Sequence, residues 1–558
     1  MIQLSDESLK ENVLEYCRHI ANSCEVVAVS FHGPRVCGYA HEKSDVHVLL
    51  VLRGYKIGLR YHIKALNEVN TFVLAVDQRI FQRDVERGWL GEFVAEKVTF
   101  PYEPLINKEY LRRHEVKSKR RIVWELLDNL LLEFPELSQE LLIKAEYFMY
   151  ETLRRRAKLF PPITYSFLNM FSPRLRRRNT DLIMSGYFEA INQLAEENWI
   201  AFSDGYVKVT QNYVNAIRSQ KIRIPPFLKS IQRTTLLHLL NIFPRITSLF
   251  MQEQKTYKKS HPKIEAEQLV FQLQNPEKYL MMPTPHGLVP LSDRTSLEVF
   301  TEKIVSNKNV SDINMKEMGG VLNTVYLLTY RENSKERRVI VKDFEDWFGF
   351  KWFPLALWTL GTKTFAVLGR SRLEREYAVN QYLHNHSFTV PRILHVSHKE
   401  RLIFKEYIEG DNLVETIKQI LSPEEKAAKA ILVRKVGRKI AEAHKLGVSL
   451  GDCKPENIVI AQDGNIFFVD LEQASRDGDQ TWDIAEFLYY SGHYASPLSP
   501  TSSAELIATE FIKGYLEVGG KKETIRKAGS PRYTKVFSIF TLPHVILAIS
   551  NICRKMGS

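Results

Sequence analysis

Two short segments in the last quarter of the chain constrain its fold more than any other feature. The first, residues 449–457 (SLGDCKPEN), places Asp452, a Lys two residues on and an Asn five residues on in one tight loop. The second, residues 469–472 (VDLE), places Asp470 at the end of an apolar run. Carboxylate and amide oxygens around a lysine suit a hard cation and a phosphate group. We therefore expect a catalytic and metal-binding loop; the alternative is a solvated turn between two strands.

The residues that would bind a nucleotide lie upstream. Segment 318–326 (MGGVLNTVY) has a turn at Gly319 and Gly320, followed by a β-branched and aromatic run. Glycine lets backbone N–H groups approach a phosphate closely. Segment 338–342 (RVIVK) predicts a strand that ends at Lys342, where the ammonium can pair with phosphates. An exposed lysine at the end of a strand is the alternative.

A helix over residues 372–383 follows, and then a strand that runs into a hinge over residues 401–410. Glu376 is the acid we expect to hold the strand lysine, and Glu374 is its competitor. The two lie about 200° apart on a helix, so only one of them can face the cleft. The strand runs into a predicted hinge at Glu406 and Tyr407, whose backbone would contact an adenine ring.

Taken together, these motifs resemble the atypical protein-kinase-like superfamily over about residues 311–500. The relatives that they resemble most are the small kinase of the KEOPS tRNA-modification complex, the RIO kinases and the lipopolysaccharide core kinases. The resemblance implies a two-lobed fold that binds ATP and Mg²⁺ between the lobes. It also implies these roles: Asp452 orients or deprotonates the acceptor hydroxyl, Lys454 contacts the γ-phosphate, Asn457 and Asp470 hold Mg²⁺, Lys342 pairs the α/β-phosphates, and Glu376 holds Lys342.

Three departures from the kinase pattern refine this prediction. Leu450-Gly451 replaces the usual His-Arg, so the loop has no Arg to receive an activation-loop phosphate. Leu471-Glu472 replaces Phe-Gly after the metal Asp. Asp483 resembles the Asp that opens the next helix in small-molecule kinases, and it follows too soon for a long activation segment. We expect a constitutively assembled site whose acceptor need not be a peptide.

Composition places the chain among ordinary soluble proteins. Its 558 residues predict about three domains, with 44% hydrophobic and 25% charged residues. The 5 cysteines form no CxxC pair, which argues against a zinc ribbon and fits a reducing cytoplasm. Residues 1–10 do not resemble a signal peptide, and the uncharged run 536–553 is short for a membrane span. We expect that run to be a buried helix, and the aromatic cluster 347–358 to pack between domains or form a contact patch.

Residues 1–110 alternate predicted helices and strands, the strands over 26–31, 43–52 and 71–77. They resemble the polymerase-β-type nucleotidyltransferases. The resemblance assigns the nucleotide and metal positions to Gly33, Ser44, Asp45, His47 and Asp77. However, Pro34 replaces a phosphate-binding Ser, and His47 replaces a metal carboxylate, although Mg²⁺ prefers oxygen ligands. We expect a degenerate domain that binds nucleotides or serves as a scaffold.

Positive charge is concentrated in the middle of the chain. The net charge is +12, and residues 111–240 contain 21 Lys and Arg against 13 Asp and Glu. The clusters at 154–156 and 174–178 have few acids nearby and are typical of surfaces that attract phosphate backbones. A solvated basic face is the alternative. The relatives of the kinase region point to RNA, either tRNA or rRNA, as the expected partner.

The middle of the chain also predicts a helical domain. Amphipathic helices are expected over 111–170, and a helix over 182–198 capped by 179–181. A hairpin over 199–210 would follow. A helix followed by a hairpin resembles a winged helix. Residues 246–310 are rich in Pro and Lys and predict an extended linker or wrapping arm.

The sequence therefore predicts an α+β multidomain protein. Its parts are a nucleotidyltransferase-like α/β domain (1–110), a basic helical and winged-helix domain (111–245), a linker (246–310) and a two-lobed protein-kinase-like domain (311–558, with lobes 311–405 and 406–558). The expected function is ATP- and Mg²⁺-dependent phosphoryl transfer to a protein Ser/Thr or a non-peptide hydroxyl, or a related ATPase activity. Alternatives are nucleotidyl transfer through Asp45 and Asp77, and a non-catalytic ATP- and nucleic-acid-binding scaffold. The prediction allows a protein partner, and contact with a membrane is not expected.

Overall fold

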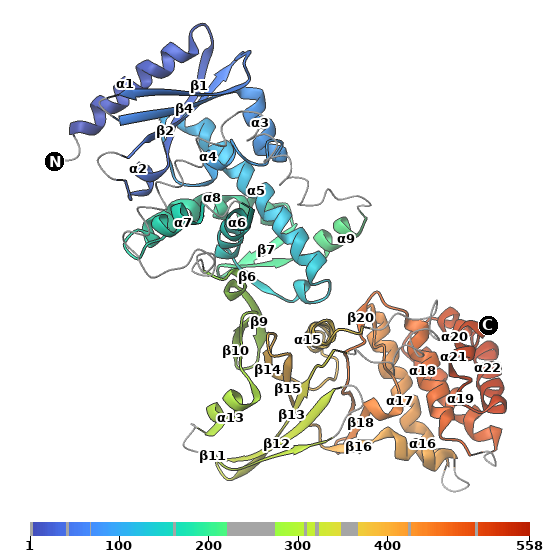
Figure 1. Cartoon of the computed structure of the whole chain (residues 1–558). Helices are drawn as coiled ribbons and strands as arrows, with labels where there is room; N and C mark the ends of the chain where they lie inside the picture. Colours follow the sequence, from blue (N-terminus) through green and yellow to red (C-terminus); the bar gives the residue numbers. More distant parts are fainter. Residues whose placement is uncertain are drawn as a thin grey trace. The chain divides into compact units, whose positions relative to one another are not determined.

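The chain folds into two compact units, which are described separately (Figure 1). The structure, a computed structural model, describes residues 4–40, 44–66, 69–159, 163–219, 274–305, 310–318, 323–346, 366–421, 426–496 and 500–558. The first unit comprises Met1–Leu132 and Leu142–Leu280, and the second comprises Glu133–Leu141 and Met281–Ser558. The predicted domains 1–110 and 111–245 thus share one unit. The glycine turn at Gly319 and Gly320 and the aromatic cluster 347–358 lie outside the described residues.

The first unit is built on a five-stranded sheet of order β3-β4-β2-β1-β5. The strands are β1 (Glu25–His32), β2 (Val46–Arg53), β3 (Leu59–Leu66), β4 (Val69–Asp77) and β5 (Tyr102–Ile106). Strand β2 pairs β4 in parallel, and the other described pairs are antiparallel. Side chains of β2 alternate between two apolar cores: Val48 and Leu50 pack with helix α1 (Leu4–Ala21), whereas Leu49 and Val51 pack with α3 (Gln78–Arg87). Burial of both faces makes β2 the centre of the sheet.

The sequence predicted the inner strands of this sheet but not the outer ones. The expected strands at 26–31, 43–52 and 71–77 fall on β1, β2 and β4. The two edge strands, β3 and β5, have no fully buried residue. A strand that lies at an edge lacks the apolar run that makes a buried strand recognisable.

Helices and a short hairpin complete the first unit. The helices are α2 (Pro34–Cys37), α4 (Glu96–Thr99), α5 (Lys108–Glu133), α6 (Glu146–Leu159), α7 (Ile163–Met170), α8 (Arg176–Glu196) and α9 (Gln211–Ser219), and the strands are β6 (Leu142–Lys144), β7 (Ile200–Ser203) and β8 (Tyr206–Val209). The hairpin β7–β8 turns at Asp204 and Gly205, both at positive φ. The predicted cap at Asn179 is wrong: helix α8 begins earlier, and the buried Asn179 amide donates to the carbonyls of Cys37 and Met170.

The first of the two basic clusters, residues 154–156, is engaged in ion pairs within the first unit. Arg156 is only 4% exposed, and its guanidinium lies 3.0 Å from the Glu92 carboxylate, which also binds Arg121 at 2.8 Å. Arg154 and Arg155 both contact Glu151, at 2.8 and 2.7 Å. The structure therefore corrects the expectation of a basic surface at Arg156, which is buried and paired with acids. Arg154 and Arg155 stay partly exposed and share the one carboxylate of Glu151.

Replacing Glu92 with Gln is expected to lower the free energy of unfolding of the first unit by about 3 kcal/mol, the lower end for breaking a buried ion pair. Two buried guanidinium groups lose the carboxylate that they share, while Arg121 keeps Glu125 and Arg156 keeps Glu96. Burial opposes ionisation of Glu92, but Arg121 and Arg156 outweigh it and lower the Glu92 pKa. The stabilisation is therefore complete above the pKa of an unfolded glutamate, about 4.3, and is lost as the pH falls below it. Denaturant unfolding at neutral and acidic pH measures both effects.

The matched control is Glu197→Gln, which removes the same charge from an exposed pair with Arg120. We expect a loss of about 1 kcal/mol or less from this surface pair. Equal losses from the two variants would contradict a central role for Glu92.

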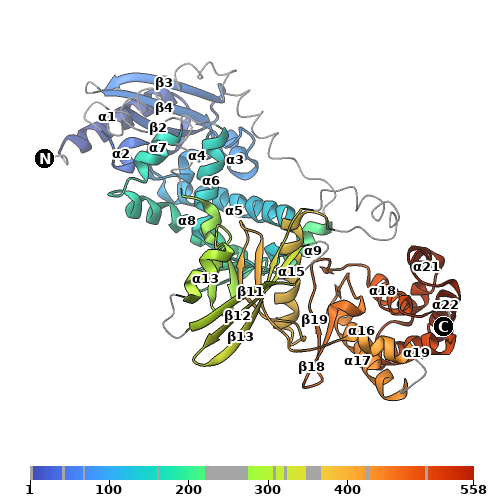
Figure 2. The ribbon, with the colours of Figure 1, turned by 60° about the horizontal axis from the view of Figure 1, so that its bottom comes forward.

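The second unit has two lobes (Figure 2). The first lobe is an antiparallel sheet of order β11-β12-β13-β15-β14 with helix α15 (Gly369–Asn385). Its strands are β11 (Val310–Glu317), β12 (Thr324–Glu332), β13 (Lys335–Asp343), β14 (Ile393–Ser397) and β15 (Leu402–Glu406). The second lobe has helices α16 (Leu413–Leu421), α17 (Lys426–Lys445), α18 (Gln480–His493), α19 (Thr501–Glu517), α20 (Lys522–Ala528), α21 (Pro531–Phe537) and α22 (Pro543–Met556), with short strands β16 (Gly410–Asn412), β17 (Val448–Ser449), β18 (Ile458–Ala461), β19 (Ile466–Phe468) and β20 (Ser475–Arg476).

The described part of the predicted linker is folded, and residues 246–273 of that linker lie outside the described residues. Residues 276–305 form a 3₁₀ turn, η3 (Pro276–Tyr279), a hairpin of β9 (Leu280–Thr284) and β10 (Gly287–Pro290), and helix α13 (Leu297–Val305). Phe300 of α13 stacks on Phe404 of the first-lobe sheet, with ring centroids 3.9 Å apart, and the Tyr377 hydroxyl donates to the Pro283 carbonyl at 2.8 Å. The main segment of the second unit therefore begins at Met281, before the predicted boundary at 311. Prolines that suggested an extended arm lie instead in a turn and a hairpin.

The uncharged run 536–553 is not one helix. Helix α21 ends at Phe537, and Pro543 starts α22. Proline fits the first turn of a helix but not its interior, so the run is split. Among the residues that the structure describes, no helix is both long and apolar enough to cross a membrane.

Candidate functional site

The predicted catalytic loop is held in place by a buried aspartate from the next helix. Asp483 of α18 is fully buried and accepts hydrogen bonds from the backbone N–H groups of Leu450 and Gly451 at 2.7 and 2.8 Å. It also accepts from the Ser449 hydroxyl at 3.0 Å and lies 3.0 Å from His444 Nε2. Gly451 has a φ of 79°, which favours glycine. Leu450 and Gly451, which stand where the kinase pattern has His-Arg, are thus held through their backbone N–H groups by the Asp483 carboxylate.

Within this loop, the structure brings together the three predicted polar residues. Lys454 Nζ lies 3.0 Å from the Asp452 carboxylate, and the Asn457 amide nitrogen donates to the Asp452 carbonyl at 3.2 Å. The Val469 N–H donates to the Asn457 carbonyl at 3.0 Å, which ties the loop to the strand before Asp470. Burial opposes the charge of Lys454, but Asp452 outweighs it and raises the Lys454 pKa.

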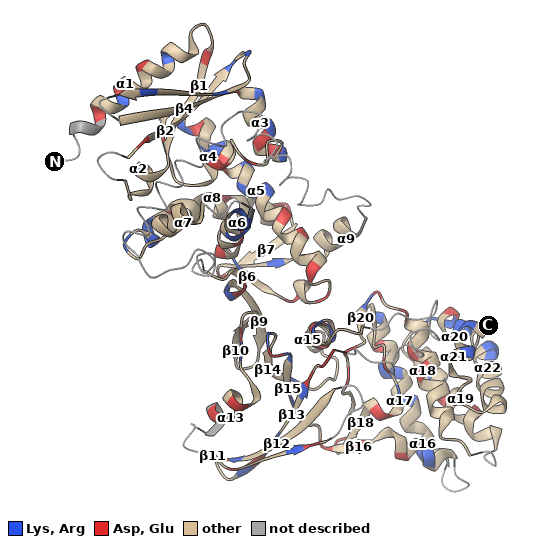
Figure 3. Ribbon diagram, in the orientation of Figure 1, with Lys and Arg blue, Asp and Glu red and all other residues tan. Residues whose placement is uncertain are grey.

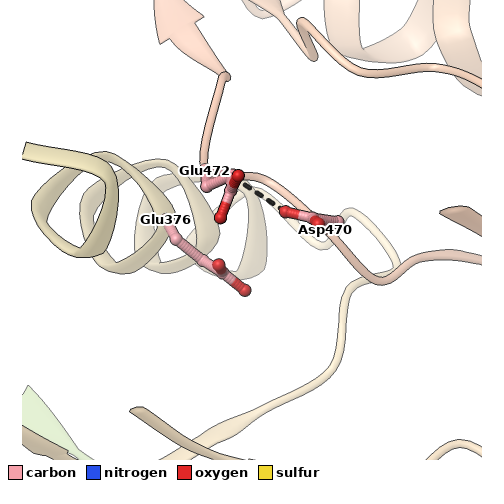
Figure 4. A group of neighbouring side chains, drawn as sticks. All are labelled: Glu376, Asp470 and Glu472. Carbon is pink, nitrogen blue, oxygen red and sulfur yellow. Dashed lines mark hydrogen bonds between the residues drawn. The ribbon is translucent and has the colours of Figure 1, made fainter. Parts of the chain in front are cut away.

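Opposite the loop, one lysine meets three carboxylates. Lys342 Nζ lies 2.9 Å from Glu376, 2.8 Å from Asp470 and 2.8 Å from Glu472. Oxygens of the three carboxylates lie within 4.8 Å of one another (Figure 4). Glu374 points to different partners, His398 Nε2 at 2.8 Å and Arg370 at 3.0 Å. Of the two competing acids, Glu376 is therefore the one that contacts the strand lysine.

The pKa values of this cluster are shifted by burial and by the neighbouring charges. Burial opposes ionisation of Asp470, but Lys342 and Lys405 outweigh it and lower the Asp470 pKa to about 2. For Glu472, burial raises the pKa and the neighbouring Asp470 adds to it, against the opposing pull of Lys342 and Arg372. Burial lowers the Lys342 pKa, but the three carboxylates more than reverse this, so the net shift is upward. Asp470 is thus an anion at neutral pH.

Sequence reasoning missed the other members of this cluster. Arg372 is fully buried and donates to Glu472 at 3.2 Å and to Asn323 Oδ1 at 2.7 Å. Lys405 contacts Glu376 and donates to the Val469 carbonyl at 2.8 Å. Two signals were present: Lys405 interrupts an apolar strand, and Arg372 lies one helical turn before Glu376. Neither signal shows that both residues converge on one site.

The predicted hinge lies at the end of β15. The Glu406 carboxylate accepts from the Arg392 backbone N–H at 2.8 Å and from its side chain at 3.0 Å. The Tyr407 N–H donates to the Arg338 carbonyl at 3.4 Å. These bonds anchor the hinge to the sheet that carries Lys342.

The residues present fit a Mg²⁺ ion. Asp470 offers an ionised carboxylate, and the bond from the Asn457 nitrogen leaves its amide oxygen as the atom that would face a cation. Oxygen ligands of this kind are those that Mg²⁺ prefers. When bound, such an ion supplies neutralisation of phosphate charge.

The residues assigned to a nucleotidyltransferase site do not assemble as predicted. The parallel register of β2 and β4 sets Thr71 beside Val46 and Asp77 beside Leu52, so Asp45 and Asp77 lie near opposite ends of the strands, about 20 Å apart. Asp77 instead caps α3, accepting from the Arg79 N–H at 2.9 Å. The expectation that Asp77 joins Asp45 is therefore wrong.

Among the remaining residues of this group, His47 lies in a stack of rings. His47 stacks between His32 and Phe72, with ring centroids 5.6 and 5.5 Å apart. Burial, assisted by Lys97, lowers the His47 pKa to about 4, so the ring is neutral. Gly33 has a φ of 85°, and a Cβ there would lie 3.0 Å from the His47 ring. The Ser44 carbonyl accepts from Arg35 at 3.1 Å.

Comparison with known proteins agrees with the geometry of the second unit. Residues 329–491 match the lipopolysaccharide kinase (Kdo/WaaP) family. The KEOPS complex subunit Bud32 of Pyrococcus abyssi is 27% identical over 157 residues, which are 28% of this chain and 67% of the relative. A probable serine/threonine-protein kinase BUD32 homolog of Archaeoglobus fulgidus is 29% identical over 140 residues, 25% of this chain and 64% of the relative. These similarities, together with the contacts of Lys342, assign the C-terminal region of the chain to the atypical protein-kinase-like superfamily.

Proposed function

We propose that the second unit transfers the γ-phosphoryl group of Mg²⁺–ATP to a hydroxyl acceptor. The observation that carries this proposal is the contact of Lys342 with both Glu376 and Asp470. A lysine positioned by a helix glutamate and shared with the metal aspartate is the arrangement that kinases need for transfer.

Each side chain has a defined task in this reaction. Lys342 exchanges carboxylate contacts for α/β-phosphate oxygens, while Glu376 keeps its ammonium in place. Asp470 and Asn457 would hold Mg²⁺. Asp452 orients the acceptor hydroxyl and accepts its proton, and Lys454, 3.0 Å from it, contacts the γ-phosphate.

The proposed acceptor is a hydroxyl group, and the names of the similar proteins suggest two classes of molecule that could carry it. One relative is named as a probable serine/threonine-protein kinase, and the matching family is named for lipopolysaccharide. Only the short stretch between Asp470 and α18 is available for an activation segment. This brevity supports a non-peptide hydroxyl or a folded protein surface over an extended peptide. The Pyrococcus relative is named as a subunit of a complex, which supports a protein partner.

The test compares two radiolabels in one reaction. With Mg²⁺ and cell extract as acceptor, [γ-³²P]ATP should label a product or release phosphate, and [α-³²P]ATP should not. Asp452→Ala should cut γ-label transfer by on the order of a hundredfold or more, the usual size of a general-base contribution. Asp45→Ala should leave it unchanged. Transfer of α-label that disappears in Asp45→Ala would overturn the kinase proposal in favour of nucleotidyl transfer.

A second candidate function, RNA binding by the first unit, has one specific observation in its favour. Helix α8 begins with Arg176, Arg177 and Arg178, all exposed, and its first turn contains no acid (Figure 3). The helix dipole makes this end positive already, so three arginines there are unfavourable unless an anion lies nearby. Nucleic-acid phosphates would supply that charge.

Replacing Arg176, Arg177 and Arg178 with Ala is expected to flatten the salt dependence of RNA binding. Each lost phosphate contact reduces the log–log slope by about 0.7 to 0.9, so a change of roughly two to three units is expected for the three arginines. Filter binding of a tRNA pool at several salt concentrations measures the slope. The matched control is Arg154→Ala with Arg155→Ala, because both contact Glu151 instead. No RNA retention at low salt, or an unchanged slope, would contradict the proposal.

A further inference from the structure

A nine-residue segment from the first half of the chain folds as part of the kinase unit. Glu133–Leu141 belongs to the second unit, although the residues on both sides of it in the sequence belong to the first. Phe134, Leu137 and Leu141 of this segment are buried. Its 3₁₀ turn, η1 (Leu137–Gln139), packs against helix α15.

The polar side of this segment surrounds one arginine. Arg476 of β20 donates through Nε to the Glu136 carboxylate at 3.0 Å, through Nη1 to Glu140 at 2.9 Å and through Nη2 to the Glu136 carbonyl at 2.7 Å. The Arg476 side chain is 10% exposed, and the two carboxylates are 11% and 6% exposed. The guanidinium also lies over the ring of Tyr382 in α15, 5.0 Å from its centroid. Hydrogen bonds of this charge-assisted kind are strong and directional.

Arg476 lies where it can influence both catalytic aspartates. In the pairing of β17 with β20, Arg476 is opposite Val448, and Ser475 is opposite Ser449. Strand β17 leads directly into the loop of Asp452, and β20 follows Asp470 closely in the sequence. A bond that fixes Arg476 therefore fixes a strand pair that borders both aspartates in the sequence, because β17 comes just before Asp452 and β20 comes just after Asp470.

The other end of the segment holds the start of helix α15. The Arg370 guanidinium lies over the Phe134 ring at 5.0 Å and 3.5 Å from Glu133. Phe134 also packs edge-to-face on His398, whose Nε2 contacts Glu374. Helix α15 carries Glu376, so the segment bridges the helix that holds Lys342 and the strands that hold the catalytic loop.

Many kinases assemble these same elements by phosphorylation, because a phosphate on the activation segment pairs with arginines and orders the loop. Here Leu450-Gly451 offers no arginine, and Arg476 is instead paired with two carboxylates. We propose that Glu133–Leu141 is a built-in activating segment, in which Glu136 and Glu140 take the place of an activating phosphate. This inference rests on the proposed kinase function. It makes that activity dependent on the segment Glu133–Leu141, which comes from the first half of the sequence.

The test uses the full chain and measures kcat at saturating Mg²⁺–ATP. Removing the two charges with Glu136→Gln and Glu140→Gln should lower kcat at least about fivefold, the lower end of coupling between distant sites. Arg476→Gln should lower it similarly, and Arg476→Lys should recover part of the loss. Combining all three Gln substitutions should cost less than the product of the separate losses, because they break one interaction. The matched control is Glu517→Gln, which removes a carboxylate that binds Arg434 and Arg438 in the same unit.

The outcomes separate this inference from the proposed function. A wild-type chain that turns over ATP, with Glu136/Glu140 variants as active as Glu517→Gln, would overturn the activating segment and leave the kinase function standing. Independent, multiplicative losses would also overturn it. A wild-type chain without turnover would overturn the kinase function and the inference with it. Faster amide exchange at Val448 and Ser449 in the Gln variants, with the unfolding midpoint retained, is the accompanying sign of a positioning role.

Discussion

An Asp470→Asn variant is expected to lose ATP turnover by on the order of 10³-fold, the upper range for removing one charge-stabilising group from an active site. The Asp470 carboxylate is ionised and lies 2.8 Å from Lys342, so its loss removes both the expected Mg²⁺ ligand and a partner of the phosphate-binding lysine. Turnover of [γ-³²P]ATP and the affinity for Mg²⁺–ATP should both fall.

Asp463→Asn is the matched control, because Asp463 is an exposed aspartate in the turn between β18 and β19 and accepts hydrogen bonds from its near neighbour Asn465. It should retain wild-type turnover. Full turnover by Asp470→Asn would contradict the assignment of the site.

The second large effect is expected from Asp483→Asn, which should lower the free energy of unfolding of the second unit by about 3–5 kcal/mol. One carboxylate accepts from two backbone N–H groups and a hydroxyl, and faces His444 as well. An amide places an NH₂ group where the loop already presents donors, and leaves at least one of them unsatisfied. Denaturant unfolding measures the loss, and turnover should fall with it because the loop of Asp452 loses its anchor.

The control for this variant is Glu523→Gln, which breaks an exposed pair with Lys527. Its cost should be about 1 kcal/mol or less. A similar stability for both variants would show that Asp483 is not the anchor of the loop.

The catalytic loop could be predicted because its information is local. Asp452, Lys454 and Asn457 lie within six residues, and a short hairpin brings Asp470 back beside them. The spacing of these residues in the sequence is therefore enough to predict that their side chains lie close together. The sequence showed that only one of Glu374 and Glu376 can face the cleft, because the two cannot share one helix face. The contact of Glu376 with Lys342 in the structure decides between them.

The failures have a common physical cause, which is that they depend on register or on distant contacts. Asp77 was assigned beside Asp45 from strand order alone, whereas the parallel register carries it to the other end of the sheet. The contact of Glu136 with Arg476 spans 340 positions in the sequence. The charge pairing of Arg156 with Glu92 likewise could not be read from a run of arginines.

The most direct test of the central claim is a paired measurement on the wild type and Asp452→Ala in the presence of Mg²⁺. Affinity for ATP is measured by titration, and transfer or release of the γ-phosphate is followed in the same samples. We expect the variant to bind Mg²⁺–ATP with nearly wild-type affinity and to lose on the order of a hundredfold or more in γ-phosphate turnover. Wild-type turnover in the variant, or no ATP binding by the wild-type chain, would contradict it.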